Sequence, residues 1–139
     1  MFLVDTNVLS ELVANRPNAG VVRWAASVDE RLLSISVVTI AEMRHGVQLL
    51  PAGRRREALE ISLVRQIIPR FRDRTLPVTV DIADQWGRCI TVARRTGYTI
   101  GAMDGLIGAT ALVHDLTVVT RNVADFEPLG VPVLNPWDV

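Results

Sequence analysis

Residues 2–7 of this 139-residue chain read Phe-Leu-Val-Asp-Thr-Asn, and this stretch decides the fold that we predict. Three consecutive apolar residues, without the alternation of a half-exposed strand, are typical of a strand covered on both faces of its sheet. Residues 32–35 and 117–120 repeat this pattern, and residues 131–134 repeat it more weakly. Strands of this kind usually run parallel to one another.

The segments between the apolar runs have helical features. Asn18 can cap a helix that extends to Val28. Thr39 can cap a second helix, whose apolar stripe has helical spacing and consists of Ile40, Met43, Val47 and Leu50. Each helix would connect two strands, which is the arrangement that produces a parallel sheet.

Three further helices are expected in the rest of the chain. Residues 53–72 form a long amphipathic segment that Pro69 interrupts near its end. Asp81 can cap the next helix, which ends before Gly97 and whose stripe consists of Ile82, Trp86, Cys89, Ile90 and Ala93. Residues 102–114 are apolar on nearly every side and predict a buried helix. We therefore predict one α/β domain over residues 1–139, a three-layer sandwich with a central parallel sheet.

Composition narrows the function further. Fifteen basic and fifteen acidic residues give a net charge of zero, and all fifteen basic residues are arginine. Chemistry that requires a lysine is therefore excluded. Cys89 is the only cysteine, so an internal disulfide and a cysteine-based zinc site are excluded as well. The sequence begins without a signal-like region, and its longest near-apolar run is about half of a bilayer span. We expect a cytoplasmic protein without membrane contact.

Carboxylates stand at the ends of several predicted elements. Asp5 follows the first strand, Glu42 lies one turn into its helix, and Asp104 stands at the start of the buried helix. Each has an ordinary alternative role, as a helix cap or a solvated helix residue. However, ligands of parallel sheets bind beyond the carboxyl ends of the strands, where these side chains can converge. Clustered carboxylates repel one another unless a cation lies between them, and oxygen ligands suit Mg²⁺ or Mn²⁺.

Other polar residues accompany these carboxylates. Asn7 can orient Asp5 through a side-chain hydrogen bond. Thr120, Asn122 and Asp125 follow another strand and offer oxygen ligands, although an ordinary turn explains them equally well. The sequence therefore predicts an acidic site with supporting polar residues at one edge of the sheet.

Four motifs together resemble the PIN-domain family over almost the whole chain. They are Val-Asp-Thr-Asn at residues 4–7, Thr-Ile-Ala-Glu at 39–42, Ala-Met-Asp at 102–104 and Val-Thr-Arg-Asn at 119–122. Residues 67–69 and the terminal Asn-Pro-Trp at 135–137 add a resemblance to the VapC-type toxins of toxin–antitoxin pairs, especially the FitB-like subgroup. The resemblance implies a metal-dependent endoribonuclease that a small antitoxin restrains.

The resemblance also implies roles for residues. Asp5, Glu42 and Asp104 match the acidic triad of the family, and the fourth acidic position of many members corresponds to Asn122, which is an amide here. Asp125 can substitute for it, or Asn122 can ligate through its carbonyl oxygen, and weaker metal binding is the expected consequence. We expect Asp5 and Asp104 to bind Mg²⁺, with Mn²⁺ as a substitute and Glu42 as a direct or water-mediated ligand.

Arginines are the candidates for contacts with RNA. Arg121 lies beside the predicted site, where it can bind a substrate phosphate through two hydrogen bonds. Residues 54–56 are three consecutive arginines, and further arginines follow at positions 65, 70, 72 and 74. They form either a solvated helix face or a surface for phosphate or for the acidic tail of an antitoxin.

Competing functions lack required residues. A receiver-type phosphoacceptor domain also gathers aspartates around Mg²⁺, but it relies on a lysine. Dehalogenase-type phosphatases begin with Asp-x-Asp, and no phosphate-binding glycine loop is present. One Glu-x-x-His, at Glu42 and His45, is too little for a di-iron bundle, and His114 is equally peripheral. Trp24, Trp86 and Trp137 are assigned to the core or to interfaces, since their positions do not support base stacking.

The partners expected from the resemblance are an RNA substrate and a VapB-type antitoxin. We also expect a homodimer, with a larger heteromer when the antitoxin is bound, and contact with DNA only through the antitoxin. The alternative is a PIN-fold subunit with little nuclease activity that chiefly binds a DNA-binding partner.

Overall fold

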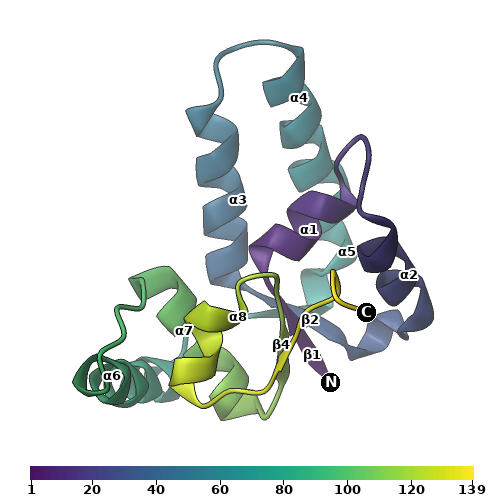
Figure 1. Ribbon diagram of the computed structural model, residues 1–139. Coiled ribbons are helices and arrows are strands. Elements are labelled where there is room, and N and C mark those ends of the chain that lie inside the picture. The colour runs from purple at the N-terminus through teal and green to yellow at the C-terminus, as the bar shows by residue number, and fades with distance from the viewer.

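Five parallel strands form one sheet at the centre of the molecule (Figure 1), which is a computed structural model that describes residues 1–139. The strands are β1 (Phe2–Val4), β2 (Leu33–Ser36), β3 (Thr75–Leu76), β4 (Thr117–Val119) and β5 (Val133–Leu134). Their order across the sheet is β3-β2-β1-β4-β5, and each neighbouring pair is parallel. The predicted parallel sheet is confirmed.

Apolar side chains cover both faces of the sheet. Leu3 and Val118 belong to one hydrophobic core, together with residues of the segments 82–93 and 107–111. Their neighbours Val4 and Val119 belong to a second core on the opposite face. Because successive side chains of a strand point to opposite faces, uninterrupted apolar strands fill both cores. The three-layer sandwich is therefore confirmed.

Eight α-helices surround the sheet. They are α1 (Thr6–Leu12), α2 (Ala19–Ser27), α3 (Val37–Leu49), α4 (Arg54–Ile61), α5 (Ile68–Arg70), α6 (Val80–Arg95), α7 (Ala102–His114) and α8 (Val123–Phe126). Short 3₁₀ segments occupy Glu30–Leu32, Arg72–Arg74 and Glu127–Leu129, and Ser62–Ile67 is a π-helix between α4 and α5. None of the helices combines the length and hydrophobicity that crossing a bilayer requires.

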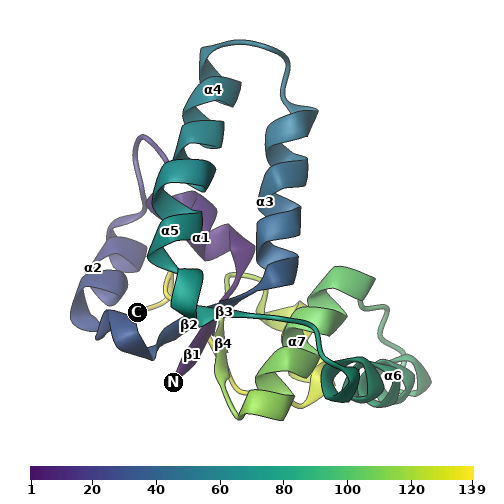
Figure 2. The ribbon, with the colours of Figure 1, turned by 180° about the vertical axis from the view of Figure 1, so that it is seen from behind.

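Helices α3 and α4 stand side by side and project from the sheet as an arm, which both views show (Figures 1 and 2). The arm returns to the sheet through the π-helix and α5. This region matches the long helical segment predicted for residues 53–72, but its hydrogen bonding changes at Ser62. Leu63 and Ile67 of the π-helix are buried, so the irregular turn still packs on the core.

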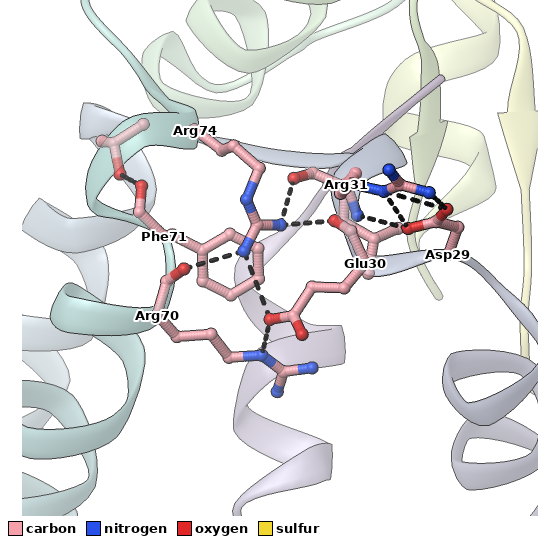
Figure 3. A network of polar contacts seen from close by, with 8 residues as sticks. Asp29, Glu30, Arg31, Arg70, Phe71 and Arg74 are labelled. Carbon is pink, nitrogen blue, oxygen red and sulfur yellow. Dashed lines mark hydrogen bonds and ion pairs between the residues drawn. The ribbon is translucent and has the colours of Figure 1, made fainter.

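Arginine side chains fasten the base of the arm to the strand that precedes it (Figure 3). Arg74 donates to the carbonyl oxygens of Glu30, Leu33 and Arg70, with N···O distances of 2.7 Å for the last two. Its guanidinium carbon lies 4.8 Å from the centre of the Phe71 ring. Arg70 and Arg74 both pair with the Glu30 carboxylate. We call this group, with the Asp29–Arg31 ion pair beside it, the arginine clamp.

Local details differ from the sequence prediction at several points. Ser36 rather than Thr39 caps α3, because β2 ends directly at Ser36 and its hydroxyl accepts from Val38 N. Thr79 rather than Asp81 caps α6, and Asp81 lies in the first turn. Strand β3 was not predicted, since two half-buried residues make no apolar run. Asp5 and Asn18 cap their helices as predicted.

The position of β1 determines where a ligand can bind. The chain proceeds from β1 to β2 and β3 on one side, whereas β4 and β5 lie on the other side. The connections therefore diverge between β1 and β4, which leaves a crevice beyond their carboxyl ends. Asp5 follows β1 and Thr120 follows β4, so both stand at this crevice.

Candidate active site

Asp5 is a buried ionisable residue at the crevice, and 3% of its surface is exposed. Its Oδ1 accepts from Thr6 N at 2.8 Å, which caps α1. Its Oδ2 accepts from the Thr120 hydroxyl at 2.8 Å and from Asn7 Nδ2 at 3.2 Å. These bonds fix the orientation of the carboxylate, and Asn7 contacts it as the sequence predicted.

Thr120 connects the loop after β4 to the loop after β1. Its fully buried hydroxyl donates to Asp5 and accepts from Asn7 Nδ2 at 3.1 Å and from Asn122 N at 3.0 Å. A hydroxyl has one donor and two lone pairs, so all three are used. Asn7 Oδ1 accepts from Arg121 N at 3.2 Å. The two loops are thus held together by side chains from both.

Glu42 reaches the same cleft from α3. Its Oε1 accepts a hydrogen bond from the Thr6 hydroxyl at 2.7 Å. Thr6 directly follows Asp5, so Glu42 is linked to the first turn of α1 next to the buried carboxylate. One turn earlier on α3, the fully buried hydroxyl of Thr39 has no hydrogen-bond partner.

Asp104 lies in the first turn of α7, where Gly101 rather than Asp104 occupies the capping position. The neighbouring Gly105 brings α7 against α6, because a Cβ at this position would lie 2.7 Å from Trp86 Nε1 and 2.8 Å from Ile90 Cδ1. This close approach of two helices sets where the first turn of α7 meets the cleft.

Burial and electrostatic repulsion both raise the pKa of carboxylates in this cleft. Burial, together with the charges of Asp5, Glu42 and Asp125, raises the pKa of Asp104 to about 6. Burial also raises the pKa of Asp5, which the hydrogen bonds from Thr120 and Thr6 partly oppose. Both shifts mean that the ionised forms are disfavoured here. A cation bound among these groups would lower the cost of burying their charges and would offset the repulsion between them.

The polar cleft that joins these side chains has a volume of about 500 Å³. Its wall is formed by Asp5, Thr6, Asn7, Ser10, Glu11, Glu42, Asp104, Arg121, Asn122 and Trp137. The structure therefore brings together all of the predicted site residues except Thr120, which is buried behind Asp5, and Asp125. Asp125 acts on Asp5 and Asp104 through its charge but does not line the cleft.

Four residues in the wall of the polar cleft were not predicted from the sequence. Thr6, Ser10 and Glu11 belong to α1, and the helical spacing from Asn7 to Ser10 is the signal that could have found them. Trp137 carried no local signal. It was assigned to the core or an interface, and it does pack against the second core, but it also lines the cleft. Trp24 is buried and Trp86 packs against the first core, as predicted.

The chemistry of the cleft fits a hard divalent cation. Its candidate ligands are all oxygens, and no arginine forms an ion pair with Asp5, Glu42 or Asp104. As they stand, no three His, Cys, Asp or Glu side chains are close enough to hold one ion. The cluster is therefore open, and binding would require its carboxylates to draw together. The amide of Asn122, which makes no capping bond for α8, is exposed at the same cleft.

Comparison with known proteins gives consistent results. The family model described as PIN domain matches residues 2–127. Toxin FitB of Neisseria gonorrhoeae is 40% identical, and the VapC ribonuclease Y4jK of Sinorhizobium fredii is 36% identical, each with 99% of both chains covered. The solved structure of FitAB bound to an IR36 DNA fragment contains a chain with a TM-score of 0.93 and 39% identity, covering 100% of this chain and 97% of that one.

Proposed function

The chain belongs to the PIN-domain family, and from this premise we propose that it is a metal-dependent endoribonuclease, the toxin of a VapBC-type toxin–antitoxin pair. The observation that carries the proposal is the convergence of Asp5, Glu42 and Asp104 on one polar cleft, where none of the three forms an ion pair. The names of relatives that match almost end to end, a VapC ribonuclease and a FitB toxin, support the reaction class and the toxin role.

We assign the metal to the carboxylates of the cleft. Asp5 and Asp104 would hold Mg²⁺, and Glu42 would ligate directly or through water. When bound, the ion supplies an activated water and stabilises charge on the phosphate. Mn²⁺, which prefers the same oxygen ligands, would replace it. Thr120 and Asn7 keep the Asp5 carboxylate oriented, and Thr6 holds Glu42 in place before the ion arrives.

Substrate contacts are assigned to the rim of the cleft. Arg121 is exposed at this rim, and its guanidinium can bind a phosphate of the RNA strand through two hydrogen bonds. Asn122 takes the fourth position of the site through its amide oxygen, since it lines the cleft and Asp125 does not. Asp125 lies outside the wall of the cleft and acts on Asp5 and Asp104 through its negative charge.

We further assign a protein partner. The FitAB complex, which includes a chain of the same fold, binds DNA. By this likeness, our chain would bind a VapB-type antitoxin in the cytoplasm, form a homodimer that assembles into a larger heteromer, and contact DNA only through the antitoxin.

A second candidate function keeps the partner and removes the catalysis. In this alternative the chain is a PIN-fold subunit with little nuclease activity that chiefly binds the antitoxin. Two observations favour it: the amide at Asn122 replaces a carboxylate, and the cluster is open as it stands. Both reduce metal affinity relative to a four-carboxylate site.

One experiment separates the two candidates. Wild type and Asp5→Asn are expressed without any antitoxin, and growth and the 5′ and 3′ ends of cellular RNA are followed. Purified proteins are then assayed on the same RNA with Mg²⁺, Mn²⁺ or excess EDTA. The nuclease proposal expects growth arrest and new RNA ends that require Asp5 and a metal. Cleavage by Asp5→Asn, or cleavage in EDTA, would rule it out, and a wild type without cleavage would favour the binding subunit.

A further inference from the structure

Arg121 and Trp137 form a pair at the mouth of the cleft whose role is not explained by the fold. The Arg121 guanidinium carbon lies 5.3 Å from the centre of the Trp137 ring. We propose that Trp137 is a positioning residue, which holds the guanidinium of Arg121 at the rim so that it meets a phosphate of the RNA strand. This inference rests on the proposed function, since it concerns how that substrate is bound.

The side-chain hydrogen-bond donors of Arg121 are not used within the protein. Five other arginines form the ion pairs of the structure, which are Arg31, Arg44, Arg70, Arg74 and Arg88. Arg121 makes only a backbone hydrogen bond, from its N to Asn7 Oδ1. Its side chain is nevertheless part of the wall that contains four carboxylates, those of Asp5, Glu11, Glu42 and Asp104. Five N–H donors therefore remain available to a ligand of opposite charge.

Coulomb attraction alone would draw Arg121 onto those carboxylates. A guanidinium among Asp5, Glu42 and Asp104 would occupy the place that we assign to the cation. The ring of Trp137 offers a competing site, because the face of an indole attracts the guanidinium and leaves the N–H donors of the guanidinium unused. Trp137 thus keeps the positive charge near the carboxylates but outside them.

Trp137 is itself held by a tight turn of the chain end. Trp137 N donates to Asn135 Oδ1 at 3.0 Å, and Asn135 Nδ2 donates to Asp138 Oδ2 at 3.1 Å. Both ribbon views place the C-terminus beside α2 (Figures 1 and 2). There the buried Pro136 lies so close that a Cβ on Gly20 would be 3.0 Å from its carbonyl oxygen. The ring is therefore a fixed surface.

The backbone of Arg121 is fixed through the same residues as Asp5. Asn7 donates to Asp5 and to Thr120, and its oxygen accepts from Arg121 N. The chain end at Trp137 and the loop at Arg121 are thus two independently held elements that meet at the cleft. This arrangement predicts that the two side chains act on substrate as one unit.

A double-mutant cycle on RNA binding tests this unit. A fluorescently labelled single-stranded RNA that the wild type cleaves is titrated into the Asp5→Asn protein, which carries Arg121→Ala, Trp137→Leu or both. We expect Arg121→Ala to weaken binding about tenfold and to lower the slope of log K against log [salt] by about 1. Trp137→Leu alone should weaken binding about three- to fivefold, and the double variant should bind no more weakly than Arg121→Ala.

Two controls keep the outcome specific. Trp137→Phe retains an aromatic face and should recover most of the affinity. Arg94→Ala removes an exposed arginine of α6 that has no ion pair, and it should leave binding within about twofold. In the cleaving protein, Trp137→Leu should raise KM more than it lowers kcat, because it changes how substrate is held. Thermal melting shows that each variant is folded.

The results distinguish the inference from the function on which it rests. If the wild type cleaves RNA but Trp137→Leu weakens binding equally with and without Arg121, Trp137 acts through the fold and the inference is wrong. Unchanged binding in Trp137→Leu overturns it as well. If the wild type neither cleaves nor binds RNA, the proposed function itself has failed.

Discussion

The acidic cleft and the arginine clamp surround the same kind of side chain with opposite charges. At the clamp, a hydrogen bond from Arg31 lowers the pKa of Asp29 to about 2, and hydrogen bonds and charge from Arg70 and Arg74 lower that of Glu30 (Figure 3). In the cleft, burial and neighbouring carboxylates raise the pKa of Asp5 and Asp104. The carboxylates of the clamp form ion pairs within the chain, whereas Asp5, Glu42 and Asp104 of the cleft form none.

The comparison shows what each arrangement is suited for. Arginines that pair with carboxylates join distant segments, here Arg70 and Arg74 at the base of the arm with Glu30, just before β2. Buried carboxylates gathered without an ion-pair partner cost stability, and a bound cation would offset this cost. The predictions that follow remove charges from one region or the other.

The largest effect is expected on catalysis. Asp5→Asn and Asp104→Asn each remove a carboxylate from the cleft, and RNA cleavage should fall at least about a hundredfold because the metal supplies several kcal/mol of transition-state stabilisation. Asp29→Asn, at the clamp, should cleave within about twofold of the wild type. Initial rates on one RNA substrate measure all three. A cleavage defect in Asp29→Asn as large as in Asp5→Asn would remove the distinction between the regions.

The next effect concerns stability, and here the larger change is expected at the clamp. Arg74→Ala leaves the carbonyl oxygens of Glu30, Leu33 and Arg70 without their donor, so the free energy of unfolding should fall by about 2–3 kcal/mol. Arg88→Ala removes only the exposed ion pair with Asp84 and should cost about 0.5 kcal/mol or less. Urea unfolding followed by circular dichroism measures both. Equal losses would show that the clamp is an ordinary surface network.

A smaller effect depends on pH. The pKa of Asp104 is near 3.8 when unfolded and about 6 when folded, so ionisation of Asp104 destabilises the folded state. The penalty is absent below pH 4, develops between pH 4 and 6 and is complete above pH 6. In metal-free protein, Asp104→Asn should therefore be more stable than the wild type at pH 7, by about 1 kcal/mol after allowance for partial exposure.

The matched variant at the clamp should respond in the opposite direction. Asp29 has a lowered pKa when folded, so its charge contributes stability above pH 4 that is lost as the pH falls toward 2. Asp29→Asn should thus lose its disadvantage in acid, whereas Asp104→Asn should lose its advantage. Urea unfolding in EDTA provides the comparison, at pH 7 and pH 4 for Asp104→Asn and at pH 7 and pH 2 for Asp29→Asn. A wild type that is more stable than Asp104→Asn at pH 7 would contradict the repulsion in the cleft.

The sequence predicted what depends on local pattern. The apolar runs at residues 2–4 and 117–120 predicted parallel strands, and the rule for carboxyl ends then predicted that the polar residues after them lie at one edge of the sheet, where Thr120 donates to Asp5. The exact start of α3 was not predictable in this way, because Ser36 and Thr39 can both cap a helix. Only the end of β2, which pairing with β1 and β3 determines, selects Ser36.

What the sequence could not predict depends on distant contacts. Trp137 reaches the cleft because the chain end turns against Gly20, more than a hundred positions earlier, and no periodicity records this packing. The clamp is similar, since Arg74 selects carbonyl oxygens some forty positions away. The arginines at 70 and 74 belong to this clamp, whereas Arg54 and Arg55 line a separate groove beside α1.

The central claim is that the cleft requires a cation from outside the chain. Its most direct test is the melting temperature of wild type, Asp5→Asn and Asp29→Asn in EDTA and then with increasing Mg²⁺ or Mn²⁺. A ligand at a hundred times its Kd stabilises a folded protein by about 2.7 kcal/mol. We predict a saturable rise in the wild type and in Asp29→Asn that is absent from Asp5→Asn. The same rise in all three proteins, or none in the wild type, would contradict the account.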